Sequence, residues 1–239
     1  MPAASDRSPF AIAPRPGSRH IGWSLHLGDG LTSMFASSVG RKVVMALTGL
    51  IWYGFLVGHL VGNLQLLAGD GGVAFDDYAA FLEASAALVV PTEVILLLAL
   101  VLHIYAAVSL SREARAARPV GYRELRTVGG RSVASRTMIY SGLVIVVFLA
   151  QHIFNFKYGD RVDGSLFALV DTTFGQPLWA GFYMFAMIVL GFHLWHALRS
   201  AFQTLGLSAR PTLRRLSILL SVLIAGGFAL IPAAMFVGG

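Results

Sequence analysis

Residues 43–67 read VVMALTGLIWYGFLVGHLVGNLQLL and contain no Asp, Glu, Lys or Arg. As an α-helix, which rises ~1.5 Å per residue, this stretch is long enough to cross a hydrocarbon layer of about 30 Å. A helix is required there because lipid cannot satisfy the hydrogen bonds of an extended backbone. Four similar apolar stretches follow, at 88–110, 137–156, 178–198 and 216–237. The sequence therefore predicts an all-α polytopic membrane protein with five transmembrane helices in a bundle.

The composition restricts the classes of protein and of cofactor. Of the 239 residues, 56% are hydrophobic and only 13% are charged, and the mean hydropathy is +0.71. These values exclude a disordered chain, a nucleic-acid-binding tail protein and a typical soluble enzyme. The chain has seven histidines, seven methionines and no cysteine. Disulfides, thiolate-held iron–sulfur clusters and covalent c-type haem are excluded, so any redox cofactor must be held mainly by His or Met.

The basic residues predict how the bundle is oriented. All of them except Lys157 and Arg161 lie before the first span, between the second and third, or between the fourth and fifth. Because positive charge marks the cytoplasmic side, we expect a multi-pass protein of the bacterial cytoplasmic membrane with a cytoplasmic N-terminus and an external C-terminus. Residues 1–36 are expected to form a flexible cytoplasmic arm, and residues 37–239 the five-helix membrane domain.

Histidines occur in four of the five spans, where ionisable residues are costly and usually functional. At ~1.5 Å per residue from the nearest cytoplasmic arginine, His59 lies ~27 Å and His152 ~24 Å from that side, whereas His103 lies ~13 Å and His193 ~9 Å. The four therefore form an outer pair, His59 with His152, and an inner pair, His103 with His193. Two stacked pairs of neutral imidazoles on facing helices are what two b-type haems require, with two axial nitrogens for each iron.

Small residues near two of these histidines favour the same interpretation, because they let a flat ring approach a helix closely. They are Gly58 and Gly62 near His59, and Ala99, Ala106 and Ala107 near His103. The alternative is that the histidines are hydrogen-bonded packing residues, which explains four of them at two matched depths less well. His196 is expected at the membrane interface, with an exchange of roles with His193 or a contact to a haem propionate as alternatives.

Polar residues at the two ends of the bundle are candidates for the remaining contacts. On the cytoplasmic side, Ser38, Arg41 and Arg136 are candidate partners of haem propionates, although basic residues there also serve simply to set the topology. On the external side, residues 75–83 are expected to form a short interfacial helix. Its Asp77 and Glu83 are candidates for proton exchange with a quinone, with a solvated acidic loop as the alternative. Amides at the same end, which hydrogen-bond either a quinone or one another, are Asn63, Gln65, Gln151 and Asn155.

Several stretches resemble the b558-type cytochrome b subunit of succinate dehydrogenase, over about residues 36–237. They are SSVGRK (37–42), MALTG (45–49), GHLVGNLQ (58–65), SRTMIYSG (135–142), FHL (192–194) and SAFQTLG (200–206). The resemblance implies a single-chain, five-helix, dihaem membrane anchor that docks a flavoprotein subunit and an iron–sulfur subunit on the cytoplasmic side. Electrons from succinate would pass through FAD, the iron–sulfur clusters and the two haems to a membrane quinone, which is menaquinone in most dihaem members.

The resemblance also implies the ligand assignment. His59 and His152 correspond to the ligands of the distal haem, and His103 and His193 to those of the proximal haem. The chain departs from the family at Gly191, where some fumarate-reducing relatives carry a glutamate that serves as a proton path. A path through that glutamate is therefore not expected here.

Two other functions stay open at this point. A dihaem cytochrome b that anchors another dehydrogenase, such as a hydrogenase or a formate dehydrogenase, would have a similar haem layout and differ in its partner subunits. A His-lined transporter would contain no haem, and its substrate site would be expected at interrupted helices near mid-depth. Neither the direction of turnover, succinate oxidation or fumarate reduction, nor the oligomeric state follows from the sequence.

Overall fold

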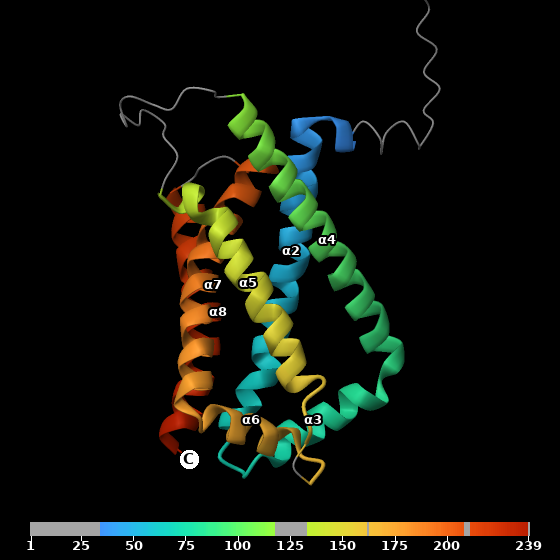
Figure 1. Ribbon diagram of the computed structural model, residues 1–239, viewed down its shortest axis with the longest axis vertical. Helices are drawn as coiled ribbons and strands as arrows, with labels where there is room; N and C mark the ends of the chain where they lie inside the picture. Colours follow the sequence, from blue (N-terminus) through green and yellow to red (C-terminus); the bar gives the residue numbers. More distant parts are fainter. Residues whose placement is uncertain (1–33, 118–132, 162, 208–210, 239) are drawn as a thin grey trace, which may run out of the picture.

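The computed structural model describes residues 34–117, 133–161, 163–207 and 211–238, and its regular elements are helices (Figure 1). Five of them are long and apolar enough to cross a membrane. They are α2 (Ser38–Asn63), continued by the 3-10 helix η1 (Leu64–Leu67), α4 (Ala86–Ala116), α5 (Val133–Phe156), α7 (Pro177–Thr204) and α8 (Pro211–Gly238). The five predicted spans are confirmed, and each helix includes or nearly includes the predicted stretch. The orientation of the bundle in the membrane stays a prediction.

Local signals explain where several of these helices begin and end. Ser37 precedes α2, and its Oγ accepts a hydrogen bond from the backbone N–H of Gly40 at 2.9 Å, as an N-cap does. Pro177 occupies the first turn of α7, where a missing N–H costs nothing. α7 ends at Thr204, and Gly206 shortly after it has a φ of +79°, which suits glycine. There the N–H of Leu207 bonds to the carbonyl of Phe202 at 2.9 Å.

α7 is the central helix of the bundle. It packs against α2, α5 and α8, and its interface with α8 is the most extensive of the described chain. Small side chains make that close approach possible: Ala186 and Ala201 are buried on α7, and Ser217, Ser221 and Ala225 on α8. Gly191 belongs to the same contact, because a methyl group there would lie only 3.1 Å from the Cβ of Ala225. Gly191 therefore has a packing function.

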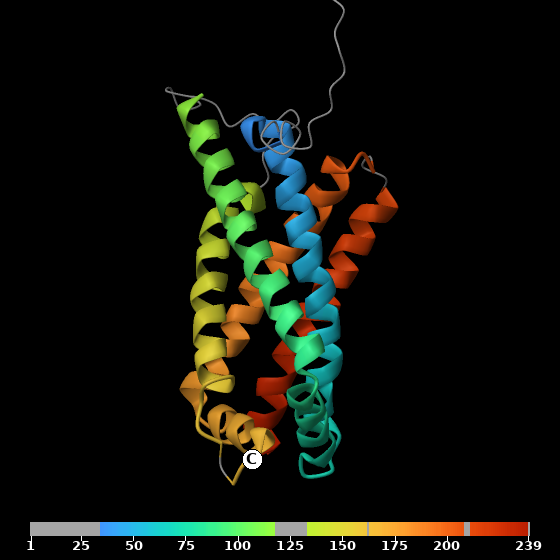
Figure 2. The same ribbon diagram turned by 90° about the vertical axis from the view of Figure 1, so that its right-hand side faces the viewer.

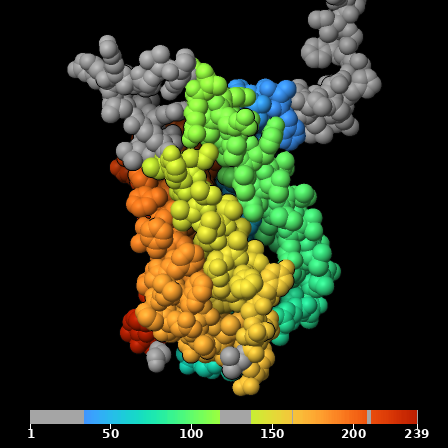
Figure 3. All heavy atoms as spheres, in the orientation of Figure 1, coloured from blue at the N-terminus to red at the C-terminus, as the bar shows by residue number. Residues whose placement is uncertain are grey.

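α4 lies at the edge of the molecule and packs mainly against α2 (Figures 1 and 2). Figure 3 shows its side chains along one border of the surface. Large apolar residues along α4 are exposed from Leu88 to Val108. In a membrane helix such a face contacts lipid or another apolar surface.

The two ends of the bundle differ in structure. We call the end where α2 and α8 begin and α4 and α7 end the basic end, and the opposite one the acidic end. Two short helices, α3 (Val73–Ala84) and α6 (Leu166–Phe174), lie at the acidic end (Figure 1). The helix predicted over residues 75–83 is thus confirmed as α3.

Asp76 of α3 joins the two short helices. Its carboxylate accepts hydrogen bonds from the Ser165 hydroxyl at 2.6 Å and from the N–H groups of Leu166 and Phe167 at 2.9 Å each. The two N–H groups are at the start of α6, where backbone donors have no partner within the helix. Burial raises the pKa of Asp76, but the hydrogen bonds and the positive charge of Arg161 outweigh burial and leave the pKa below its ordinary value of 3.8. The ionised side chain therefore acts as a cap supplied by another helix.

We predict that Asp76→Ala lowers the free energy of unfolding in mild detergent by about 1–2 kcal/mol, because the N–H groups of Leu166 and Phe167 lose their acceptor, while the N-cap Ser165 still accepts from Ala168. Since the pKa of Asp76 is lowered in the folded protein, its contribution is present above pH 3.8 and is lost as the pH falls through the folded-state pKa. Thermal unfolding of wild type and variant at pH 7 and below pH 3.8 measures both effects. Asp77→Ala, which removes an exposed carboxylate one residue away, is the control and should change little.

Candidate functional site

His103 of α4 is held by a hydroxyl group of α2. The Oγ1 of Thr48 lies 3.2 Å from its Nδ1. The same Oγ1 donates its only proton to the backbone carbonyl of Val44, at 2.8 Å. A hydroxyl that has given away its proton can only accept, so Nδ1 of His103 carries the hydrogen. The neutral ring then has its lone pair on Nε2, the nitrogen free to bind a metal.

His193 of α7 is held in the same way by α5. The Oγ of Ser141 lies 3.0 Å from its Nδ1 and donates to the carbonyl of Met138 at 3.0 Å. The same argument gives His193 a hydrogen on Nδ1 and a free lone pair on Nε2. Hydrogen bonds of this kind are how proteins fix the tautomer and orientation of ligating histidines. The hydrogen bonds with these two hydroxyl groups thus leave Nε2 of both inner histidines free.

Glycines lie against the inner histidine rings. A methyl group on Gly49 would lie 3.3 Å from Cε1 of His103, and one on Gly142 would lie 3.7 Å from Cε1 of His193. The first distance is shorter than ordinary van der Waals contact, so Gly49 leaves room that a side chain would take.

The outer pair, His59 of α2 and His152 of α5, lies face to edge. The ring centroids are 5.7 Å apart and the planes are 87° to each other. Aromatic side chains surround them: Phe55 and Phe228 contact His59, and Phe148, Phe156 and Tyr183 contact His152. A metal bound by two imidazole nitrogens lies ~2 Å from each, which separates the ring centres by about 6 Å. The 5.7 Å between the two ring centroids is close to that value.

The two Nδ1 atoms of the outer pair differ in their hydrogen bonding. Nδ1 of His152 is buried and has no hydrogen-bond partner among the described residues. Nδ1 of His59 lies 3.3 Å from the amide nitrogen of Asn63. An orphaned nitrogen in a buried ring is unusual in a protein. The side chains described here therefore leave one nitrogen of the outer pair without a hydrogen bond.

Of the four amides at the acidic end, Gln151 and Asn155 bond to each other, whereas Asn63 bonds to His59. Gln151 donates to Asn155 at 2.6 Å, and Asn155 donates to the hydroxyl of Tyr183 at 3.2 Å. Tyr183 also touches the ring of His152. Sequence analysis missed Tyr183, and the only signal for it was a tyrosine inside an otherwise apolar span.

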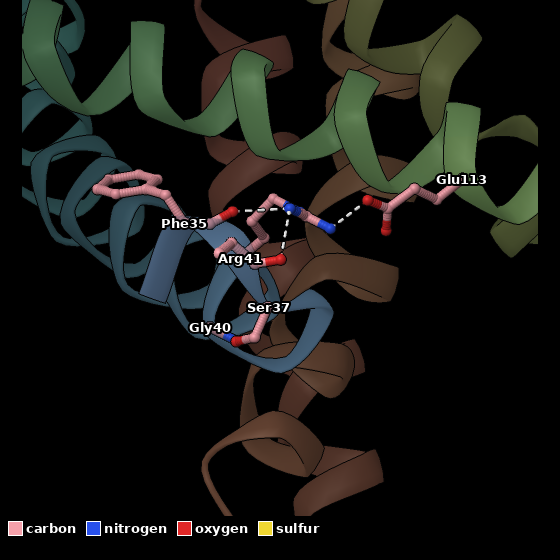
Figure 4. Close-up of polar contacts among 6 residues, drawn as sticks. Phe35, Ser37, Gly40, Arg41 and Glu113 are labelled. Carbon is pink, nitrogen blue, oxygen red and sulfur yellow. Dashed lines mark hydrogen bonds and ion pairs between the residues drawn. The ribbon is translucent and has the colours of Figure 1, made fainter. Parts of the chain in front are cut away.

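Of the predicted propionate partners, Arg41 has other contacts at the basic end. Arg41 is buried and donates to the carbonyls of Phe35, at 2.7 Å, and Ala36, at 3.3 Å, and it forms an ion pair with Glu113 of α4 (Figure 4). Its Nε–H is left without a partner among the described residues. Ser38 is exposed. The side chain of Arg136 lies outside the described residues, although its backbone is part of α5.

The other candidates also differ in their surroundings. Glu83 pairs with Arg161, and Asp77 is exposed. The room predicted beside Gly62 is filled by Tyr78, since a methyl group there would lie 2.5 Å from that ring. No side chain comes near Gly58 in this way. His196 is half-buried, one turn beyond His193 and close to Arg199.

The histidine nitrogens of this site suit a metal ion that already has most of its ligands from a cofactor. Among the described residues, no three His, Asp or Glu side chains are grouped to hold a bare metal ion. A haem iron takes four ligands from its ring and needs two from the protein. Two pairs of neutral imidazoles, with Nε2 free in the inner pair and an orphaned nitrogen in the outer pair, match that requirement.

Comparisons of the chain with protein-family models, with curated proteins and with solved structures returned no match.

We predict that Arg41→Ala destabilises the protein by about 2 kcal/mol, because two backbone carbonyls and a carboxylate lose a charged donor. Glu113 is half exposed, so solvent compensates part of its loss and the cost stays below that of a fully buried pair. Lys42→Ala, an exposed cation one residue away, is the matched control. Equal unfolding temperatures for the two variants would contradict the structural function of Arg41.

Proposed function

We propose that the chain is the dihaem cytochrome b anchor of a bacterial succinate:quinone oxidoreductase. The observation that supports this best is the state of the inner histidines. Thr48 and Ser141 hold Nδ1 of His103 and His193 and leave both Nε2 atoms available. The resemblance of the sequence to the b558-type anchor of succinate dehydrogenase supports the identity of the partner enzyme.

Each of the four helices α2, α4, α5 and α7 then has one ligand to supply. His103 and His193 would bind the inner haem iron, and His59 and His152 the outer one. Bound b haem supplies a one-electron redox centre. The hydrogen bonds at Nδ1 make the inner imidazoles more basic ligands. The aromatic side chains around the outer pair keep water away from it.

The proposed electron acceptor is a membrane quinone, with menaquinone expected from the resemblance. Reduction of a quinone to a quinol consumes two electrons and two protons, so a group that exchanges protons with water is needed nearby. Of the two proposed carboxylates, Asp77 is exposed and free to do this, while Glu83 is paired with Arg161. Asp77 is therefore the stronger candidate of the two.

The proposed partners, a flavoprotein and an iron–sulfur subunit, would dock at the basic end. The positive-inside rule places this end in the cytoplasm. The same end is nearest to His103 and His193 along their helices, so electrons would enter at the inner pair. No succinate site is proposed on this chain.

The identity of the electron donor distinguishes the proposed function from an anchor of another dehydrogenase, and the presence of haem distinguishes it from a transporter. Membranes that contain the protein should show b-type haem reduction on addition of succinate. Reduction by hydrogen or formate, with none by succinate, would favour an anchor of another dehydrogenase. A purified protein without haem would favour the transporter.

We predict that single His→Ala changes remove the haems selectively. His59→Ala or His152→Ala should abolish the outer haem and retain the inner one, and His103→Ala or His193→Ala should do the reverse, because each iron loses one axial ligand. Haem content per chain and redox titration of the remaining haem measure this. His196→Ala is the control and should retain both haems. Loss of one haem in that variant, with both kept in His193→Ala, would reverse the assignment within α7.

A second prediction concerns the hydroxyl groups. Thr48→Val should keep both haems but raise the midpoint potential of the inner one by tens of millivolts, the size of a hydrogen bond of about 1 kcal/mol. The reason is that a less basic imidazole stabilises the oxidised iron less. Thr92→Val is the matched control, because Thr92 also bonds to a carbonyl of its own helix, at 2.8 Å, but is half-buried and has no hydrogen bond to a described histidine. Equal potentials in both variants would contradict the function assigned to Thr48.

A further inference from the structure

The basic end of the α7–α8 interface contains a pocket of about 490 Å³. It lies between the last turns of α7 and the first turns of α8. Three arginines line it, Arg199 from α7 and Arg214 and Arg215 from α8. Apolar side chains complete it, among them Phe202, Leu207 and Ile218. A cationic site with apolar walls at a membrane surface suits an amphiphilic anion.

The three arginines have no carboxylate partner in the part of the chain that the structure describes. The ion pairs found there involve Arg41, Lys157 and Arg161 instead. Glu113 is the one described acidic residue near the basic end, and Arg41 already pairs with it. Three guanidinium groups around one cavity repel one another unless an anion lies between them. The pocket therefore favours a negatively charged ligand.

A second, apolar groove of about 290 Å³ continues along the same two helices. Ile218 lines both cavities, so the pocket and the groove are neighbours along the α7–α8 interface. Its walls include Gly191, Trp195, Ala225 and Gly226, and a side chain on Gly226 would meet nothing within 4 Å. Ser221 also lines the groove, but its hydroxyl donates to the carbonyl of Ser217 at 2.7 Å. The groove thus offers shape and a mainly apolar surface.

We propose that this seam binds one anionic phospholipid, with its phosphate among Arg199, Arg214 and Arg215 and an acyl chain along the groove. Basic pockets between transmembrane helices on the cytoplasmic side are suited to such headgroups. A quinone would fill the groove but leave the arginines uncompensated, and a soluble phosphate would fill the pocket but not the groove. The site shares none of the four histidines, so it stands independently of the haem proposal.

Native mass spectrometry of the purified protein, released from nanodiscs of equal phosphatidylglycerol and phosphatidylcholine, tests the headgroup. Wild type should retain phosphatidylglycerol and not phosphatidylcholine. Arg214→Gln with Arg215→Gln should weaken retention about 30-fold, since each arginine near an anionic lipid contributes about 1 kcal/mol. Arg112→Gln with Arg115→Gln removes the same charge at the same end from α4 and should retain the lipid. Equal losses in the two double variants would overturn the proposal.

A second pair of variants tests whether the apolar groove holds an acyl chain. Gly226→Leu should fill the groove and reduce retention of phosphatidylglycerol, whereas Gly181→Leu, on an open face of α7 outside the groove, should not. This pair keeps the proposal testable if the arginine variant does not fold. Displacement of the lipid by inorganic phosphate, or retention of a quinone in its place, would contradict the proposal.

Discussion

Hydrocarbon offers no hydrogen bonds to a polypeptide, so a polar group of this chain inside the membrane is stabilised by a partner within the protein. The backbone meets this requirement by forming helices. Thr48 and Ser141 meet it by donating to carbonyls of their own helices, at 2.8 and 3.0 Å. What remains on each oxygen is the ability to accept, and a histidine of a neighbouring helix provides the donor. The orientation of the inner imidazoles therefore follows from the need of each hydroxyl oxygen for a hydrogen-bond donor within the protein.

The same constraint explains how the bundle positions its four histidines. α7 packs closely on α8 through alanines and serines, which fixes His193 relative to α5 and α2. At the acidic end, Asp76 ties α3 to α6 below the outer pair. At the basic end, Arg41 ties the start of α2 to α4, the helix that carries His103. The ion pair adds to the packing of α4 against α2, and the cap joins two short helices that share few other contacts.

Sequence analysis predicted the parts of this structure that depend on local pattern. Hydropathy over about 20 residues is enough to place five spans, and counting residues from the charged ends was enough to pair His59 with His152. Contacts between distant residues were not predictable in this way. Tyr78 fills the space beside Gly62, and Asp76, not Asp77, caps a helix 90 residues further along. The donors of Arg41 are largely taken by nearby carbonyls and a glutamate, which no count of basic residues reveals.

The account depends most on the claim that the two histidine pairs bind two haems. The direct measurement is a dithionite-reduced minus oxidised spectrum of the purified chain, with haem quantified per polypeptide. Two b-type haems per chain are expected, because four imidazoles provide axial ligands for two irons. A protein that is fully folded and contains no haem would contradict the account.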